Sequence, residues 1–190
     1  MNRCYCIGCG NSLRDFDFSQ LNGFHTVGTN HILRTYPEVE ACVFLDLGFW
    51  VLASEHIKNY KGELWCPASA IPRSFRHDRL KLVRPLSAEI GMEMGEEETG
   101  IMGRLSGLAA INIAILKGYS PIYLLGYDMY GINYYDQPGA KEVIFARDGK
   151  CIERFKLFKD YEIYNLNPQS YLDVFPKVSD HRFQRHQEEG

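Results

Sequence analysis

Short apolar runs recur along the chain, and each is followed at once by Gly or Asp. They are rich in β-branched and aromatic residues, which is typical of strands buried on both faces of a parallel sheet. The runs are Cys4–Ile7, Phe24–Val27, Cys42–Leu45 and Ile122–Leu125. A further strand is predicted within 161–166, as the last element of the fold.

Longer mixed segments lie between these runs and predict helices. The strongest is 105–117, which is apolar on nearly all sides and is closed by Gly118 at the position where glycine ends helices. Residues 49–60 have the spacing of a second helix, whereas 12–21 and 31–40 suit short helices or turns. Parallel strands joined by helices build a covered sheet. We therefore expect an α/β protein with one Rossmann-like, doubly wound, mostly parallel sheet and helices on both faces.

Residues 67–99 interrupt this alternation. Three prolines break the segment, 80–83 would make one more strand, and 89–98 combine acidic residues with Gly and Met. The segment is interpreted either as an irregular loop or lid, or as a solvated connector without function. We expect one domain over 1–178 and a polar tail over 179–190.

Length and charge narrow the function classes. The chain has 190 residues, of which 45% are hydrophobic, so it suits one domain with a real core. The chain has a formal net charge of -3 and so lacks the excess of basic residues that is typical of nucleic-acid-binding proteins. The uncharged stretch 105–116 is too short to span a bilayer, and no signal peptide is recognisable. We expect a soluble cytoplasmic protein that binds no nucleic acid.

Cys6 and Cys9 have the C-x-x-C spacing of a zinc knuckle or a redox pair. A structural zinc would need two more ligands, and neither a second C-x-x-C nor an H-x-H accompanies the pair. We favour reduced cysteines that pack in the core, and we predict no metal site.

The ends of the first three strands supply candidate ligand contacts. The turn I-G-C-G-N-S-L includes Gly8, Cys9, Gly10 and Ser12, and its glycines would let free amides approach a phosphate; alternatively it is only a tight turn. Asn30 would bind a base, ribose or phosphate, or would cap the next helix.

The end of the third strand and the start of the strongest helix offer similar choices. Asp46 would bind ribose hydroxyls or a metal, or would cap a helix. Ser106 and Gly107, with Arg104 before them, would bind an anion at the amino end of the helix, unless Ser106 is an ordinary cap.

The candidate catalytic groups are two residues that follow the Ile122–Leu125 strand and two of the histidines. Asp128 is a possible base or Mg²⁺ ligand. Tyr130 would donate its hydroxyl to a phosphate, or would pack a loop. Of the six histidines, we expect only His31 and His77 to face the cleft.

Six motifs in order resemble one superfamily. They are G-C-G-N-S-L, Asn30, V-F-L-D, S-G-L-A-A-I-N-I-A-I-L-K-G-Y, I-Y-L-L-G-Y-D-M-Y and N-L-N-P-Q-S-Y-L. Together they resemble the bacterial family-42 sialyltransferases, and also the related domain of flagellin-glycosylating motility accessory proteins and the archaeal 6-hydroxymethylpterin diphosphokinase. The resemblance spans residues 3 to 178.

The resemblance implies a role for several residues. Cys9 stands where the sialyltransferases have a loop Asn, Asn30 matches a second Asn, and Asp46 replaces a third. Ser106 and Gly107 match a Ser-Gly pair that contacts the donor. Tyr130 matches a phosphate-binding Tyr, and Arg104 lies one residue away from the position of the family's Arg. The family's general base is a His after the G-x-D-x-Y motif, but residues 131–160 contain no histidine.

The expected function is therefore that of a glycosyltransferase-like enzyme. It would bind a nucleotide-activated sugar of the CMP type and transfer the sugar to an unidentified acceptor by inverting displacement. The alternatives are an ATP-dependent diphosphokinase, in which Asp46 and Asp128 hold Mg²⁺, and an inactive nucleotide-binding module. Relatives in this superfamily self-associate, which implies a homo-oligomer.

Overall fold

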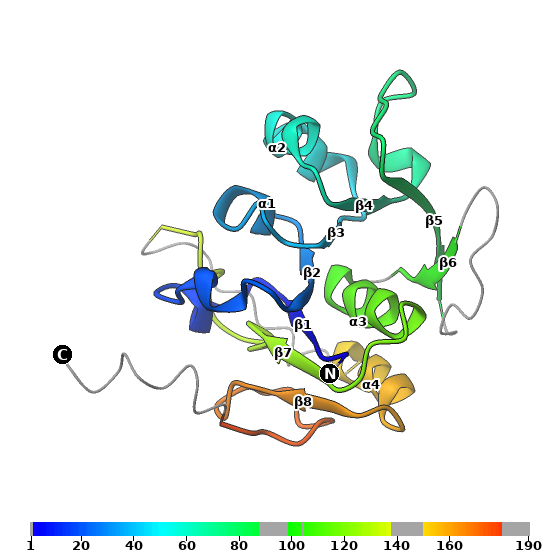
Figure 1. Cartoon of the computed structure of the whole chain (residues 1–190). Coiled ribbons are helices and arrows are strands. Elements are labelled where there is room, and N and C mark those ends of the chain that lie inside the picture. The colour runs from blue at the N-terminus through cyan, green and yellow to red at the C-terminus, as the bar shows by residue number, and fades with distance from the viewer. Residues whose placement is uncertain (1, 88–98, 104, 138–149, 180–190) are drawn as a thin grey trace.

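Eight parallel strands form one sheet in the order β6-β5-β4-β3-β2-β1-β7-β8 (Figure 1). The computed structural model describes residues 2–87, 99–103, 105–137 and 150–179. The strands are β1 (Cys4–Ile7), β2 (His25–Thr29), β3 (Ala41–Val43), β4 (Glu63–Cys66), β5 (Leu80–Leu86), β6 (Thr99–Met102), β7 (Ile122–Leu125) and β8 (Ile163–Asn165). The predicted α/β class is confirmed.

The two long predicted helices form close to their expected limits. They are α2 (Leu47–Asn59) and α3 (Ser106–Leu116), and Gly118 after α3 adopts φ +72°, as expected of a glycine at a helix end. The short helix or turn predicted within 31–40 is a single helical turn, α1 (Ile32–Thr35), and Pro37 disfavours helical backbone at the residue before it.

The remaining helical segments are short. The short helix or turn predicted within 12–21 consists of two 3₁₀ turns, η1 (Asn11–Leu13) and η2 (Phe18–Leu21). The others are η3 (Ala68–Ala70), α4 (Lys150–Phe155) and η5 (Lys156–Phe158).

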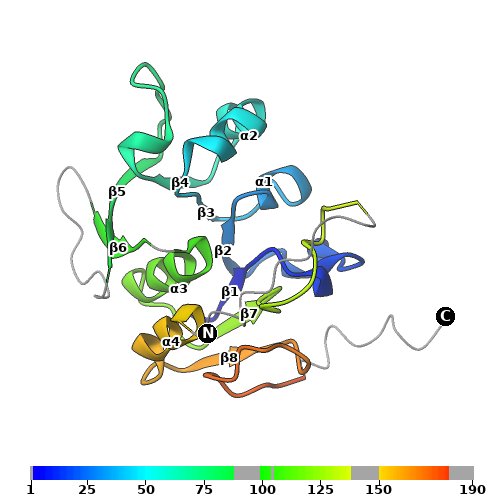
Figure 2. The same cartoon turned by 180° about the vertical axis from the view of Figure 1, so that it is seen from behind.

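Each face of the sheet has its own apolar core, as expected of a doubly wound fold. Figures 1 and 2 show the sheet curving around α3, with α1 and α2 outside the curve. On the inner face, α3 residues pack with the alternate strand residues Cys4, Cys6 and Trp65. On the outer face, Tyr5, Ile7 and Leu64 pack with residues of α1 and α2. The helices α1–α3 and their strands thus bury both faces.

The segment 67–99 is less irregular than the sequence indicates. Its residues 80–86 form β5, which pairs with β4 through Leu64–Leu80 and with β6 through Val83–Thr99. This part is an integral strand of the sheet. Residues 88–98 lie outside the described part of the chain, so the predicted lid function stays a prediction.

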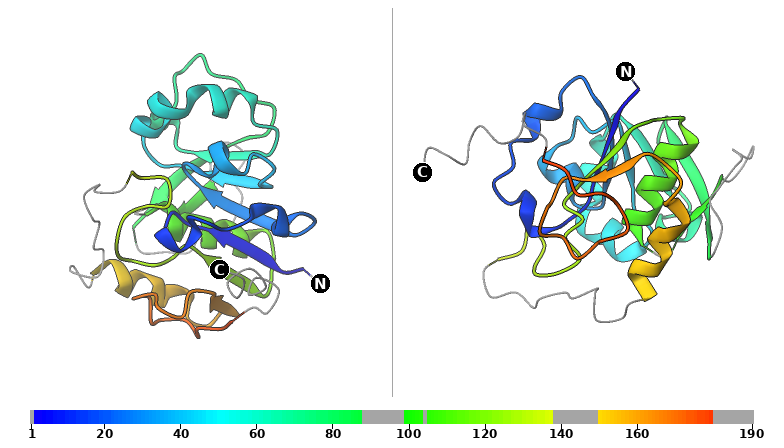
Figure 3. Two further views of the ribbon diagram at one scale, coloured as in Figure 1. Left: turned by 90° about the vertical axis from the view of Figure 1, so that its left-hand side faces the viewer. Right: turned by 90° about the horizontal axis from the view of Figure 1, so that it is seen from below.

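After β8 the chain folds back beside that strand (Figure 3). The Asn165 amide donates to the Pro176 carbonyl at 2.9 Å, and the Val178 amide donates to the Asn165 carbonyl at 2.9 Å. Most of the predicted tail, 180–190, lies outside the described residues. Within the described ranges, no helix has the length and apolar character needed to cross a bilayer.

The order of the strands places a switch point beside β1. From β1 the chain winds outward through β2 to β6, and α3 then carries it back to β7 on the other side of β1. In open α/β sheets, ligands bind at the carboxyl ends of the strands where the winding direction reverses. The carboxyl ends of β1, β2 and β7 are therefore the expected place for a site.

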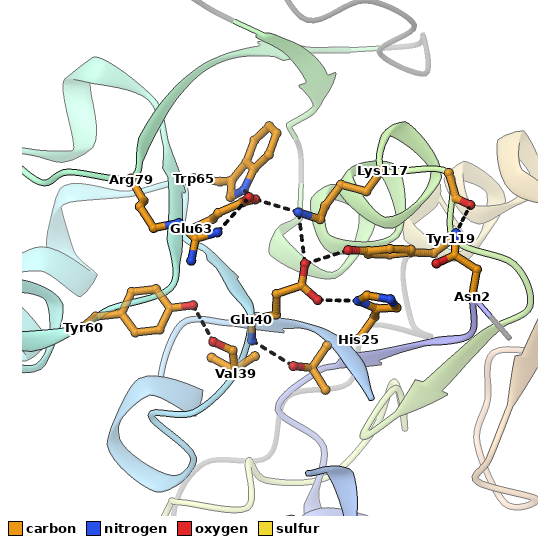
Figure 4. A network of polar contacts seen from close by, with 12 residues as sticks. Asn2, His25, Val39, Glu40, Tyr60, Glu63, Trp65, Arg79, Lys117 and Tyr119 are labelled. Carbon is orange, nitrogen blue, oxygen red and sulfur yellow. Dashed lines mark hydrogen bonds and ion pairs between the residues drawn. The ribbon is translucent and has the colours of Figure 1, made fainter. Parts of the chain in front are cut away.

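The opposite, amino edge of the sheet is held by a network of ion pairs and hydrogen bonds (Figure 4). Lys117 pairs with Glu63 at 2.9 Å and with Glu40 at 3.1 Å. Glu40 also accepts hydrogen bonds from the Tyr119 hydroxyl at 2.6 Å and from His25 Nδ1 at 2.7 Å. Since these residues flank β2, β3, β4 and α3, the network ties four elements together.

The network predicts that the stability of the fold falls at acidic pH. Burial raises the pKa of Glu40, but hydrogen bonds from Tyr119, His25 and Lys117 outweigh burial, so the pKa lies below its usual value of 4.5. A lowered folded-state pKa stabilises the fold above the unfolded-state pKa, and that contribution is lost as pH falls through the folded value. We expect Glu40→Gln to flatten the decline of melting temperature below pH 4.5, measured by circular dichroism. The exposed Glu38→Gln is the matched control, and an equal flattening in it would contradict the assignment.

Candidate functional site

A cavity of about 590 Å³ opens at the carboxyl ends of β1, β2, β3 and β7, where the winding of the sheet reverses. It is bordered by the end of each of these strands and by the first turn of α3. Nine sequence-predicted residues line it: Gly8, Cys9, Gly10, Asn30, Asp46, Ser106, Gly107, Asp128 and Tyr130. The structure therefore brings most of the predicted residues into one place.

Of the predicted residues that the structure describes, three are not among those that line the cavity. Ser12 lies just behind it and bonds to Asp128. His31 lies behind Tyr135, a lining residue, with the two ring centres 4.1 Å apart. Arg104 lies outside the described residues.

His77 is at the wrong edge of the sheet, and its prediction as a cleft residue is corrected. It precedes β5 at the amino edge, where Nε2 lies 3.0 Å from the carbonyl of Tyr60 and Nδ1 accepts from the Arg79 amide at 3.2 Å. Because both ring nitrogens have backbone partners, His77 fixes the approach to β5 rather than serving the site.

Three amides of the turn 8–12 donate to the end of β7 and to the loop after it. Gly8 donates to the Leu125 carbonyl and Gly10 to the Gly126 carbonyl, both at 2.8 Å. The Ser12 amide donates to Asp128 Oδ2, also at 2.8 Å. The expectation that these three amides are free for a phosphate is therefore wrong. The turn instead sets the wall of the cavity by pairing with the end of β7.

Cys9 projects from this turn into the cavity and separates the two halves of the C-x-x-C motif. Its Sγ lies 3.5 Å from Thr29 Oγ1, whereas Cys6 Sγ contacts the Ala110 carbonyl at 3.6 Å inside the core. Burial raises the pKa of the Cys9 thiol. Over the described residues, all six cysteines are free and no group of three or more His, Cys, Asp or Glu side chains is arranged to hold a metal.

Asn30 and Ser106 meet across the cavity. Asn30 adopts φ +47°, a left-handed conformation that Asn tolerates better than most residues. Its Oδ1 accepts a long hydrogen bond, 3.4 Å, from Ser106 Oγ. Neither side chain caps a helix: His31 is the cap residue of α1 and Leu105 that of α3. The capping alternatives for both residues are therefore wrong.

The first turn of α3 lines the cavity through Leu105, Ser106 and Gly107. Among bonds between described residues, that of the Ala109 amide to the Leu105 carbonyl is the first helical hydrogen bond of α3. The preceding amides of a helix are unpaired within it and carry its positive partial charge. This end of α3 is therefore suited to an anion.

The two carboxylates of the cavity have different environments. Asp46 caps α2, with Oδ1 accepting from the Phe49 amide at 2.9 Å, and its side chain is otherwise exposed. Asp128 is 2% exposed and accepts from Ser12 and from Asn167 Nδ2 at 2.7 Å. Asp46 can thus reach a ligand, whereas Asp128 is engaged by the protein.

Tyrosines form the wall beyond β7. Tyr130 is half-buried and packs on Tyr171, with ring centres 4.7 Å apart. Burial raises the pKa values of Tyr127 and Tyr135. Their hydroxyls therefore stay protonated at neutral pH and act as hydrogen-bond donors. Tyr127 uses its hydroxyl on the Gly107 carbonyl at 3.0 Å.

Solved structures share this architecture, although neither a protein-family model nor a curated protein matches the chain. The sialyltransferase CstII from Campylobacter jejuni, in complex with cytidine-5'-monophosphate, aligns over 97% of this chain and 88% of its own, with 21% identity and a TM-score of 0.57. The monofunctional α-2,3-sialyltransferase Cst-I from the same organism aligns over 93% and 80%, with 18% identity and a TM-score of 0.55. The chain has the sialyltransferase fold.

A CstII complex with CMP and a trisaccharide acceptor gives a similar alignment. It covers 95% of this chain and 87% of that one, with 16% identity and a TM-score of 0.55. At such identities the likeness establishes the fold.

Several cavity residues escape sequence reasoning. Thr29, directly before Asn30, donates to the Ile7 carbonyl at 3.2 Å and lies against Cys9, so the G-T-N signal at the end of β2 could have revealed it. Phe155 arrives from α4, and no local pattern marks it.

Proposed function

We propose that this protein binds a nucleotide-activated sugar of the CMP type in the cavity and transfers the sugar to an acceptor with inversion. The observation that carries the proposal is the amino end of α3, which opens with Ser106 and Asn30 into a cavity at the switch point of the sheet. The fold shared with CstII, which has been solved with CMP and with a trisaccharide acceptor, supports a donor and an acceptor of this kind.

In this proposal the donor phosphate lies at the first turn of α3. The amides of that turn, the Ser106 hydroxyl and the Tyr130 hydroxyl stabilise the phosphate as its bond to the anomeric carbon breaks. The acceptor oxygen attacks the opposite face of that carbon and loses its proton to a base. The exposed Asp46 carboxylate, which lines the cavity, is the group we propose for this role; the imidazole of His31, which contacts the lining residue Tyr135, is the alternative.

His31 is in the right protonation state to accept a proton. Burial, followed by the charge of Arg34, lowers the pKa of His31, while Asp136 opposes the shift. The ring is therefore neutral at neutral pH. If His31 is the base, the rate rises with pH as the imidazole loses its proton, and His31→Gln removes that rise. If Asp46 is the base, Asp46→Asn removes turnover whereas His31→Gln keeps the wild-type pH profile.

The diphosphokinase alternative receives less support from the geometry. It needs Mg²⁺ at Asp46 and Asp128, but Asp128 already accepts three hydrogen bonds and Asp46 caps α2. Coordination by both carboxylates would compete with these bonds. Retention of turnover in EDTA would exclude this alternative.

Calorimetric titration with CMP tests the binding step. We expect wild-type protein to bind CMP, and we expect Asn30→Ala to weaken binding by roughly 5- to 150-fold, since an unpaired polar contact costs about 1–3 kcal/mol. Asn22→Ala is the matched control, because Asn22 Oδ1 also accepts one hydroxyl, that of Tyr36 at 3.1 Å, and is not a lining residue of the cavity. No binding of CMP by wild-type protein, or equal loss in both variants, would refute the proposal.

A further inference from the structure

Three segments far apart in sequence meet at the buried carboxylate of Asp128. Oδ2 accepts from the Ser12 amide at 2.8 Å, and Oδ1 accepts from the Ser12 hydroxyl at 2.6 Å. Asn167, in the loop after β8, donates Nδ2 to Oδ1 at 2.7 Å. We call Ser12, Asp128 and Asn167 the Asp128 clasp. A buried carboxylate is stable only when hydrogen bonds to its oxygens replace those that water would make.

Backbone contacts join the same three segments. The Tyr171 amide donates to the Asp128 carbonyl at 3.0 Å, and the Ser170 hydroxyl donates to the Tyr127 carbonyl at 2.6 Å. On the other side, Gly10 donates to Gly126. The loop after β8 is therefore attached to the loop after β7, which in turn is attached to the turn after β1.

The turn after β1 rests directly on the carboxylate. A Cβ on Gly10 would lie 2.4 Å from Asp128 Cγ, so no side chain fits between the two. The position of Gly10 and Cys9, which line the cavity, consequently depends on where Asp128 is held. The position of Asp128 depends in part on Asn167, which is not among the lining residues.

We propose that Asn167, acting through Asp128, is a positioning residue that holds the 8–12 turn in the conformation that accepts the nucleotide. Asp128 is then the centre of the clasp rather than a base. Holding the turn in place before binding reduces the ordering that the ligand must impose, which raises affinity. The identity of the ligand rests on the proposed function, whereas the existence of the clasp does not.

Asn167→Asp removes the hydrogen-bond donor of residue 167 and leaves the size of its side chain almost unchanged. Asn167 Oδ1 accepts from the Gln169 amide at 2.9 Å, and aspartate keeps this local turn. It replaces the donor with a carboxylate oxygen beside Asp128, so attraction becomes repulsion. Ser12→Ala is a milder second variant, because it removes the hydroxyl donor while the amide bond to Asp128 remains. Gln169→Ala is the matched control, since its side chain is exposed on the same loop.

Two measurements at a temperature well below unfolding test the proposal. Amide hydrogen exchange by NMR reports the turn itself: we expect exchange at Gly10 and Ser12 to be about tenfold faster or more in Asn167→Asp, with a smaller change in Ser12→Ala. Titration with CMP reports the consequence: we expect affinity to fall about tenfold in Asn167→Asp and to stay unchanged in Gln169→Ala. Saturating CMP should return the Gly8 and Gly10 resonances toward their wild-type positions.

The two measurements distinguish failure of the proposed function from failure of the clasp. If wild-type protein binds no CMP, the proposed function fails, and amide exchange alone decides whether the clasp holds the turn. Wild-type exchange in both Asn167→Asp and Ser12→Ala would overturn the clasp. Faster exchange with unchanged CMP affinity would overturn the positioning role.

Discussion

Gly8→Ala is expected to lower the free energy of unfolding by about 3 kcal/mol or more, the range of severe overpacking. A Cβ at Gly8 would lie 2.5 Å from the Gly126 carbonyl oxygen and 3.1 Å from its carbon. These are backbone atoms, so relief requires separating the turn from the end of β7. That separation breaks the Gly8–Leu125 and Gly10–Gly126 hydrogen bonds. Urea unfolding followed by circular dichroism measures the loss.

Gly23→Ala provides the comparison. Gly23 has φ +85°, and no atom lies within 4 Å of the position of its Cβ. Alanine there costs only the left-handed backbone, about 1–2 kcal/mol. If both variants lose the same free energy of unfolding, the backbone conformation of glycine, and not the contact with the end of β7, accounts for the effect at Gly8.

Gly8 also shows where sequence reasoning was right and where it failed. The sequence correctly predicted a turn after β1 that needs close backbone approach. It left open whether a phosphate comes close or whether the turn is only tight, and in the structure the Gly126 carbonyl lies against Gly8. A pattern of glycines indicates that another group approaches the backbone closely. It does not identify that group, because Gly126 lies more than a hundred residues away in the sequence.

The fold was predictable where a strand is a continuous apolar run that leads directly into a turn residue. β1 and β7 are continuous apolar runs that lead into glycine, and the sequence located both. β4 and β6 were missed, because Glu63 begins one and Gly100 weakens the pattern of the other. β6 is the edge strand beside β5 and is only four residues long, so its pattern is short.

The site was predictable where it follows strand ends. Asn30, Asp46 and Asp128 each come just after a strand, and parallel strands bring their carboxyl ends to one edge. His77 failed because it follows a connector at the other edge. Asn167 was not selected, since a polar residue in an N-P loop has no local pattern that indicates a distant carboxylate.

Ser106→Asp is expected to abolish nucleotide binding without weakening the fold. Ser106 is the first residue of α3, where a carboxylate interacts favourably with the helix dipole by about 0.3–1 kcal/mol. The same carboxylate would stand where the donor phosphate is proposed to lie. Two like charges about 4 Å apart repel by about 4 kcal/mol at a protein surface, which corresponds to roughly a thousandfold loss of affinity. Calorimetric titration with CMP and thermal unfolding measure the two effects.

Ser106→Asn separates charge from the loss of the hydroxyl. Asparagine is close in size to aspartate and neutral, so its affinity for CMP should lie between those of wild-type protein and Ser106→Asp. Added salt should recover part of the affinity of the aspartate variant, because ions screen the repulsion. If Ser106→Asp binds CMP as wild-type protein does, the phosphate cannot lie at the first turn of α3. Equal losses in both variants would instead assign the effect to the hydroxyl and its contact with Asn30.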